Sequence, residues 1–258
     1  MTKWIRREKI KMNNENIIRL AEMINSSHKT VFFGGAGVST ESGVKDYRSE
    51  DGLYNTVKEY GVSPETILSH SFFIEKPETF YDFYYKYFID TTAEPNAAHI
   101  ALAKLEKAGK LSSVITQNID GLHQKAGSKN VLELHGTIER YTCPECFSPY
   151  NINDIKNMHG NIPRCKKCNA VIKPDVVLYE EPLNEEIVEK AVNEIVTADL
   201  LIIGGTSLAV YPAAMYIRYF RGENLVLINK SETQYDSSAD LVFRDSIGQV
   251  LSETIKHI

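Results

Sequence analysis

Short apolar runs recur along the chain, each bounded by glycine or polar residues. Six of them have the length and the aliphatic, often β-branched content of buried strands in a parallel sheet: residues 30–33, 113–116, 131–134, 176–179, 200–203 and 225–228. Patterns with helical spacing separate many of these runs, over residues 15–26, 97–107, 184–197 and 212–220. This alternation predicts an α/β fold built on a doubly wound parallel sheet.

Residues 52–92 interrupt the alternation. They are rich in aromatic side chains, including Phe80, Tyr81, Phe83 and Tyr84. We expect them to form a small helical module over the edge of the sheet, with most of the rings in its core. The sheet and its helices would then comprise residues 13–51, 93–137 and 172–258.

All four cysteines lie in one short stretch. Cys143 and Cys146 form one C-x-x-C pair, and Cys165 and Cys168 form a second, eighteen residues later. This spacing is typical of a tetrahedral zinc site, because each pair places two thiolates on one tight turn. Two disulfides are the alternative, but such pairs are poor staples and nothing else indicates a secreted scaffold. We expect residues 138–171 to form a module around one structural zinc ion, since four sulfur ligands leave no open position on the metal.

The charge of the chain bears on its partners. The 258 residues carry a formal net charge of −5 and the basic residues are scattered, which argues against a nucleic-acid surface and allows basic peptides. The first twelve residues are basic but lead into polar residues, so they do not form a signal peptide. No apolar run has the length of a membrane span. We expect a cytoplasmic protein with no membrane partner and no requirement for nucleic acid.

Two turns of small residues follow strands of the predicted sheet. Residues 34–39 read Gly-Gly-Ala-Gly-Val-Ser, and residues 204–207 read Gly-Gly-Thr-Ser. Together they could hold a dinucleotide at the carboxyl ends of the strands, where backbone amides can approach its phosphates. Asn229 ends a third strand, and its amide suits a ribose hydroxyl. The first turn alone is equally typical of a plain tight turn, and Asn229 alone is more typical of a turn residue that ends a strand.

Polar side chains follow two further strands. Gln117, Asn118 and Asp120 come after the strand at 113–116, and His135 follows the strand at 131–134. Enzymes with α/β folds gather their reactive groups at such strand ends. The unperturbed pKa of a histidine lies near neutrality, as a general base requires. A lone histidine is more often structural than catalytic. The hypothesis that His135 is a general base therefore rests on its position at a strand end.

Taken together, these segments resemble those of the sirtuins, which are NAD-dependent protein lysine deacylases, in their bacterial and archaeal single-domain form. The matching segments occur in the family's order across nearly the whole chain. They are Gly-Ala-Gly-Val-Ser-Thr-Glu-Ser-Gly-Val at 35–44, Asp-Tyr-Arg-Ser at 46–49, Thr-Gln-Asn-Ile-Asp-Gly-Leu-His at 116–123, Glu-Leu-His-Gly at 133–136, the cysteine quartet, Lys-Pro-Asp-Val-Val at 173–177 and Gly-Thr-Ser-Leu at 205–208. The resemblance implies a Rossmann-like NAD-binding domain. It also implies an enzyme that transfers the acyl group of a modified lysine to ADP-ribose and releases nicotinamide.

The resemblance further implies a role for each matching residue. His135 would be the general base on a ribose hydroxyl, and Asn118 would order the ribose or a nearby water. The NAD site would be lined by Ala36, Thr40, Tyr47, Arg48, Gln117, Ile119, Asp120, His135, Thr206, Ser207 and Asn229. Gln117 and His135 would lie near the nicotinamide ribose, Ile119 and Asp120 at the nicotinamide carboxamide, and Thr206, Ser207 and Asn229 at the adenosine half. An acyl-lysine peptide would pair as an added strand with residues 176–178, between the zinc module and the larger domain.

The chain departs from the family at several positions. Gly34 stands where many relatives have threonine, Tyr47 where they have phenylalanine, and Glu180 where glycine is usual, beside the expected peptide groove. Sirtuins that prefer succinyl or malonyl groups carry a tyrosine and an arginine three residues apart, where this chain has Tyr81 and Tyr84. Without an arginine to pair with an acyl carboxylate, we expect acetyl or longer apolar groups to be preferred.

Two other functions use the same features. An ADP-ribosyltransferase could use the same NAD pocket, but it would need no base such as His135. A non-enzymatic zinc-ribbon adaptor could bind nucleotide or nucleic acid, but the scattered basic charge and the set of Gln117, Asn118, Asp120 and His135 argue against it.

Overall fold

The computed structural model describes residues 13–45, 57–89 and 92–258, and its larger part is a six-stranded sheet. The strands lie in the order β3-β2-β1-β7-β8-β9 and are all parallel. They are β1 (Thr30–Gly34), β2 (Ser113–Thr116), β3 (Val131–Glu133), β7 (Leu200–Gly204), β8 (Asn224–Ile228) and β9 (Leu241–Phe243). The chain runs outward from β1 to β3 and later from β7 to β9, so the strand order reverses between β1 and β7. This is the predicted doubly wound, Rossmann-like arrangement.

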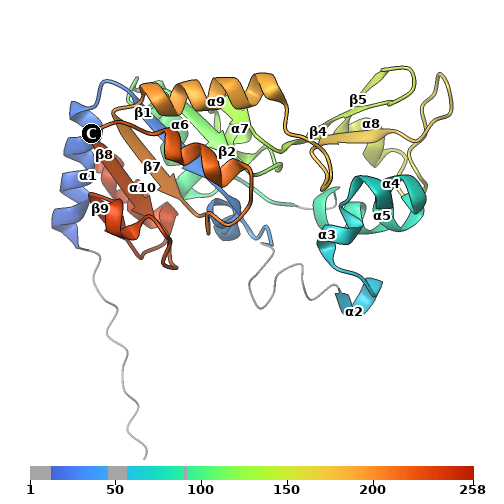
Figure 1. Cartoon of the computed structure of the whole chain (residues 1–258), viewed down its shortest axis with the longest axis horizontal. Coiled ribbons are helices and arrows are strands. Elements are labelled where there is room, and N and C mark those ends of the chain that lie inside the picture. Colours follow the sequence, from blue (N-terminus) through green and yellow to red (C-terminus); the bar gives the residue numbers. More distant parts are fainter. Residues whose placement is uncertain (1–12, 46–56, 90–91) are drawn as a thin grey trace, which may run out of the picture.

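Helices cover both faces of this sheet (Figure 1). On one face, α1 (Asn14–Ser26), α6 (Ala97–Lys107) and α10 (Ile247–Thr254) pack against strand residues such as Phe32. On the other face, α9 (Glu185–Thr197) and the 3₁₀ helix η5 (Ala213–Tyr219) pack against residues such as Phe33. Successive side chains of a strand point to opposite faces. Because both faces are covered, β1 and β7 are buried along their whole length, which explains their continuous apolar sequences.

The smaller part combines a three-stranded antiparallel sheet with short helices (Figure 1). The sheet has the order β5-β4-β6, and the elements are β4 (Gly136–Thr142), β5 (Pro149–Asn151), β6 (Lys173–Val176), α2 (Val57–Tyr60), α3 (Pro64–Ile67), α4 (His70–Glu75), α5 (Pro77–Tyr84), the π-helical turn η4 (Tyr85–Ile89) and α8 (Ile152–Lys156). The rings of Phe80, Tyr81 and Tyr84 are buried in one core with Tyr141 and Ile172. The aromatic residues therefore form a core, as predicted, and the cysteine-bearing region shares it.

Two expectations about individual segments are wrong, and a third is met with a different type of helix. The strand predicted at 176–179 is instead Lys173–Val176, and it pairs antiparallel with β4. Its side chains alternate between buried and partly exposed, so it lacks the continuous apolar run of a parallel strand. The aromatic module packs against the three-stranded sheet rather than over the edge of the larger one, because Tyr141 and Ile172 cover its rings. The helix expected over 212–220 is the 3₁₀ helix η5.

The remaining elements are single turns: η1 (Ala36–Val38), η2 (Thr40–Ser42), α7 (Leu122–Ala126), η6 (Asp236–Ser238) and η7 (Ile255–His257). Within the described ranges, no helix has both the length and the apolar character needed to cross a bilayer.

Candidate active site

The carboxyl ends of β1 and β7 lie side by side where the strand order reverses. The glycine-rich turns that follow them are in main-chain contact, since the N–H of Gly37 donates to the carbonyl oxygen of Gly205 at 2.7 Å. Gly205 has a φ of +60°, and a Cβ on it would lie 2.4 Å from the main-chain nitrogen of Val38. Glycine is therefore required for this approach. The two turns form one main-chain surface at the switch point, where α/β folds bind dinucleotides.

Gly34 is the last residue of β1. A Cβ on Gly34 would lie 2.7 Å from Cε1 of Phe32 and 3.1 Å from Cγ2 of Val38. The ring of Phe32 thus occupies the space that a side chain at position 34 would need. In this chain, glycine at position 34 is matched to the packing of its neighbours.

Ser39 is the centre of a polar cluster beside these turns. Its hydroxyl donates to Oδ2 of Asp120 at 2.7 Å and accepts from Nδ2 of Asn118 at 3.0 Å. The main-chain N–H of Asn96 donates to Nδ1 of His99 at 3.2 Å, so the proton of the neutral ring is on Nε2, 3.4 Å from Oγ of Ser39. Burial lowers the pKa of His99 and keeps it neutral. The predicted residues Asn118 and Asp120 are therefore held in place by Ser39, which His99 contacts in turn, and no local sequence pattern marks these two residues.

Gln117 and His135 are joined at the ends of β2 and β3. The Nδ1–H of His135 donates to the carbonyl oxygen of Gln117 at 2.9 Å, because a carbonyl can only accept. The neutral ring then has its lone pair on Nε2. Burial lowers the pKa of His135, although the hydrogen bond to Gln117 opposes this effect. Nε2 of Gln117 is a buried donor without a hydrogen-bond partner among the described residues, so the pair offers one acceptor and one donor to a ligand.

The other predicted NAD residues are distributed around this site. Ala36 and Thr40 lie in the turn after β1, Ile119 follows Asn118, and Thr206 and Ser207 lie in the turn after β7. The Thr40 hydroxyl donates to the Gly37 carbonyl at 3.0 Å, and the Leu208 N–H donates to Oγ1 of Thr206 at 3.2 Å. Each hydroxyl thus forms a hydrogen bond within its own turn.

Asn229 follows β8, the neighbour of β7, and therefore lies at the same edge of the sheet. Its Nδ2 donates to the carbonyl oxygen of Ser231 at 3.0 Å, so the side chain is turned toward its own loop. Tyr47 and Arg48 lie outside the described residues.

The four cysteine sulfurs form a compact cluster in the smaller part. All four lie within 4.8 Å of one another, and the shorter separations are 3.4 Å for Cys143–Cys168 and 3.5 Å for both Cys146–Cys165 and Cys146–Cys168. A zinc ion with four sulfur ligands at about 2.3 Å would place sulfurs about 3.8 Å apart. In each pair the chain turns back on itself: Phe147 N–H donates to the Cys143 carbonyl at 2.9 Å, and Asn169 N–H to that of Cys165 at 2.8 Å. The cluster fits one tetrahedral zinc ion.

A tyrosine favours the thiolate form of one of the four cysteines, whereas the other three thiols act to raise the pKa of Cys168. The Tyr150 hydroxyl donates to the sulfur of Cys165 at 3.2 Å, and this hydrogen bond lowers the pKa of the Cys165 thiol to about 5. Thiolate is the form that binds metal. The cysteines of the structure are not paired as disulfides.

Comparisons with known proteins agree with this geometry. The model of the Sir2 family matches residues 35–212. A protein of Clostridium perfringens named NAD-dependent protein deacetylase is 56% identical over 243 residues, which are 94% of this chain and 99% of that protein. A protein of Clostridium tetani with the same name is 55% identical over 239 residues, which are 93% and 97% of the two chains.

Solved structures give the same picture in three dimensions. A Sir2 enzyme solved in work on the mechanism and regulation of these enzymes superposes with a TM-score of 0.85 at 38% identity, covering 94% of this chain and 97% of that one. A Sir2 complex with a p53 peptide and NAD⁺ superposes with a TM-score of 0.83 at 37% identity, covering 92% and 96%.

Proposed function

The chain belongs to the Sir2 family, and from that premise we propose how its residues carry out NAD-dependent protein deacetylation. The activity itself is shared with the relatives, so this chain is an NAD-dependent protein deacetylase with one structural zinc site. Bound NAD supplies the ADP-ribose that receives the acyl group as nicotinamide leaves. The observation that carries the residue assignment is the neutral His135 ring, held by Gln117 at the end of β3.

We assign His135 as the catalytic general base. Its Nδ1–H is bound to the Gln117 carbonyl, so Nε2 is the atom that can accept a proton. Burial lowers the pKa of His135, and the neutral form therefore predominates at pH 7. Beside a ribose hydroxyl, this imidazole would take the proton and make the oxygen a nucleophile toward the acyl carbon.

The surrounding residues would bind NAD. The buried Nε2 of Gln117 suits a ribose hydroxyl, because this donor finds no partner among the described residues. Asn118 would order the ribose or a nearby water. Ile119 and Asp120 would hold the nicotinamide carboxamide. The remaining contacts would come from Ala36, Thr40, Tyr47, Arg48, Thr206, Ser207 and Asn229.

The acyl-lysine peptide would pair with residues 176–178. The Val177 N–H donates to the carbonyl oxygen of His135 at 2.9 Å, which fastens this segment next to the general base. The Val177 carbonyl receives no hydrogen bond from the described residues and is available to the amide N–H of an acylated lysine. A Sir2 structure 36% identical to this chain, solved bound to an acetylated peptide, supports the assignment of the substrate class.

We also propose a cytoplasmic location, without a membrane or nucleic-acid partner. Four thiols that serve as zinc ligands suit a reducing compartment. The net charge of −5 disfavours binding to nucleic acid.

The test compares two peptides of the same sequence, one with acetyl-lysine and the other with succinyl-lysine. Tyr84 is buried in the aromatic core and cannot neutralise a carboxylate as an arginine would. We therefore expect kcat/KM to be at least about tenfold higher for the acetyl peptide, since an unpaired buried carboxylate is costly. Equal rates would contradict the proposed acyl preference, and absence of NAD-dependent acetyl loss would contradict the proposed function.

A further inference from the structure

The segment that would bind the peptide is attached to the helical module through its main chain. Tyr179 N–H donates to the carbonyl oxygen of Leu68 at 3.0 Å, and His70 N–H donates to that of Tyr179 at 3.0 Å. Ser69 and Tyr179 thus form an isolated parallel bridge. The start of α4 and the segment after β6 are therefore held edge to edge.

Glu180 extends this attachment with its side chain. Its Oε2 accepts a hydrogen bond from the main-chain N–H of Ser71 at 2.9 Å and another from the Ser71 hydroxyl. Ser69 Oγ accepts from the N–H of Phe72 at 3.2 Å. The first three N–H groups of α4, which no helical carbonyl can satisfy, are thus bound by Tyr179, Glu180 and Ser69. Two of these three acceptors, Tyr179 and Glu180, directly follow the proposed peptide-binding segment at residues 176–178.

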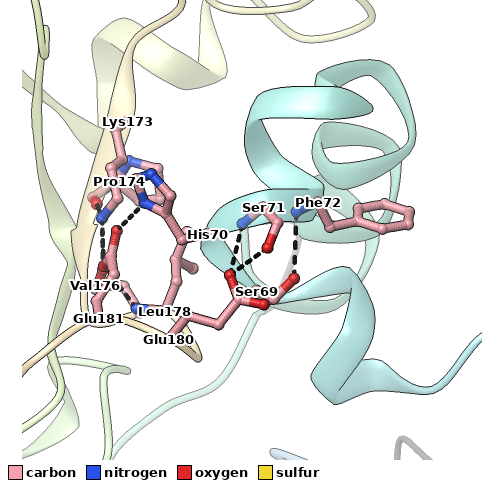
Figure 2. Close-up of polar contacts among 10 residues, drawn as sticks. All are labelled: Ser69, His70, Ser71, Phe72, Lys173, Pro174, Val176, Leu178, Glu180 and Glu181. Atoms are coloured by element: carbon pink, nitrogen blue, oxygen red, sulfur yellow. Dashed lines mark hydrogen bonds and ion pairs between the residues drawn. The ribbon is translucent and has the colours of Figure 1, made fainter.

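Glu181 holds the same segment from its other side. Its carboxylate accepts from the N–H of Leu178 at 2.9 Å, from Nδ1 of His70 at 2.8 Å and from Nζ of Lys173 at 3.0 Å. Figure 2 shows the two carboxylates directed apart, with Glu180 toward α4 and Glu181 toward β6. Consecutive acidic side chains therefore fix the turn between two elements.

The backbone at Glu180 is in a conformation that favours glycine. Its φ is +79°, in the left-handed region, which a residue with a Cβ adopts only at a cost. The chain has glutamate here, where the resemblance to the sirtuins implies glycine. The hydrogen bonds from Ser71, which lower the pKa of the Glu180 carboxyl, offset that cost. A glycine at position 180 could adopt the left-handed φ at no steric cost, but it could not accept the hydrogen bonds from Ser71.

We infer that Glu180 is a positioning residue for the protein substrate, anchoring the peptide-binding segment to α4 so that its free edge is formed before the peptide arrives. This inference rests on the proposed function, in which the peptide pairs with residues 176–178. Its physical basis is pre-organisation, because a segment that is already ordered loses less conformational entropy on binding. Without the Glu180 carboxylate, the main-chain bonds of Tyr179 and the contacts of Glu181 remain, so the segment should be less ordered and peptide binding must complete its ordering. NAD binding and the chemical step use other residues.

Three substitutions separate the carboxylate from the backbone conformation. Glu180→Gly removes the anchor and relieves the left-handed φ, Glu180→Ala removes the anchor but keeps the Cβ, and Glu180→Gln keeps an oxygen that accepts from Ser71. In the glycine and alanine variants we expect KM for an acetyl-lysine peptide to rise about fivefold. Both kcat and KM for NAD should stay within about twofold of wild type, and Glu180→Gln should restore the wild-type KM for peptide.

Thermal unfolding and amide hydrogen exchange complete the test. Glu180→Ala should lower Tm more than Glu180→Gly does, although both raise KM for peptide equally. In the unliganded glycine variant, the amides of Ser71 and Tyr179 should exchange faster than in wild type. The inference would be overturned if amide exchange at Ser71 and Tyr179 were unchanged, or if KM for peptide rose in proportion to the loss of Tm across the variants. An equal rise in KM for NAD would also overturn it. Failure of the wild-type protein to deacetylate any peptide would instead overturn the proposed function, and the exchange measurement would still decide whether Glu180 anchors the segment.

Discussion

His123 is a buried histidine whose ring nitrogens both lack a hydrogen-bond partner among the described residues. Its side chain is 1% exposed, and its ring lies 4.7 Å from that of His99, centroid to centroid. Burial, followed by the nearby His99, lowers the pKa of His123 to about 3. In the unfolded chain the pKa would be about 6.5. The folded state therefore binds fewer protons than the unfolded state. The contribution of neutral His123 to the free energy of unfolding is fully present above about pH 6.5 and is lost as the pH falls toward 3.

Replacing His123 with phenylalanine should reduce this sensitivity to acid. Between pH 7 and pH 5, the free energy of unfolding of the wild type should fall by roughly 2 kcal/mol more than that of His123→Phe. Urea unfolding at the two pH values measures the difference, and any fixed packing effect of the substitution cancels in the comparison. The same pH dependence in both proteins would show that His123 is not held neutral.

The sequence predicts where candidate site residues lie when they follow strands, and it predicts less well which other residues hold them in place. Gln117, Asn118, Asp120 and His135 are placed together as expected from the ends of β2 and β3. Ser39 and His99 were not selected, because only the tertiary contact between the turn after β1 and α6 makes them neighbours. Glu180 stands out in the sequence only as a departure from a glycine pattern. Its partner, Ser71, lies 109 positions away.

At the scale of elements, the buried strands were the most predictable. The expected ranges for β1, β2, β3, β7 and β8 differ from the observed ones by no more than one residue at an end, because continuous apolar runs mark strands covered on both faces. β9 and α10 were missed. Leu241–Phe243 is too short to form a distinct run, and Gly248 weakens the helical pattern of Ile247–Thr254.

The zinc module is the element with the clearest dependence on a ligand. Cys143 and Cys165 lie in the core that also contains the aromatic rings of α5. Loss of the metal should therefore loosen the packing of both the zinc module and the helical module. We expect one zinc ion per chain, and removal by a chelator should lower Tm by about 10 °C or more and abolish deacetylation. Adding zinc back should restore both properties. Absence of zinc from the purified protein, with no free thiols, would favour the alternative of two disulfides.

At the scale of the whole molecule, the site lies where the two parts of the chain meet. The six-stranded sheet supplies the glycine turns, Gln117 and Asn118, whereas His135 stands between β3 of the large sheet and β4 of the small one. The proposed peptide segment at residues 176–178 begins at the end of β6 and is bonded to His135 through Val177, and the next residue, Tyr179, is bonded to the helical module. The sequence could predict each part from its local pattern. How the helical module packs on the zinc module depends on contacts between distant aromatic residues, which no local pattern encodes.

The most direct measurement follows one acetyl-lysine peptide by mass spectrometry, with nicotinamide release recorded in the same reaction. Wild-type protein and a His135→Ala variant would each be incubated with and without NAD. We predict that the peptide loses one acetyl group for each nicotinamide released, only with NAD, and that His135→Ala lowers this rate by about 100-fold or more. A peptide that gains mass while nicotinamide is released would instead indicate ADP-ribosyl transfer, and acetyl loss that is independent of His135 would contradict its role as the base.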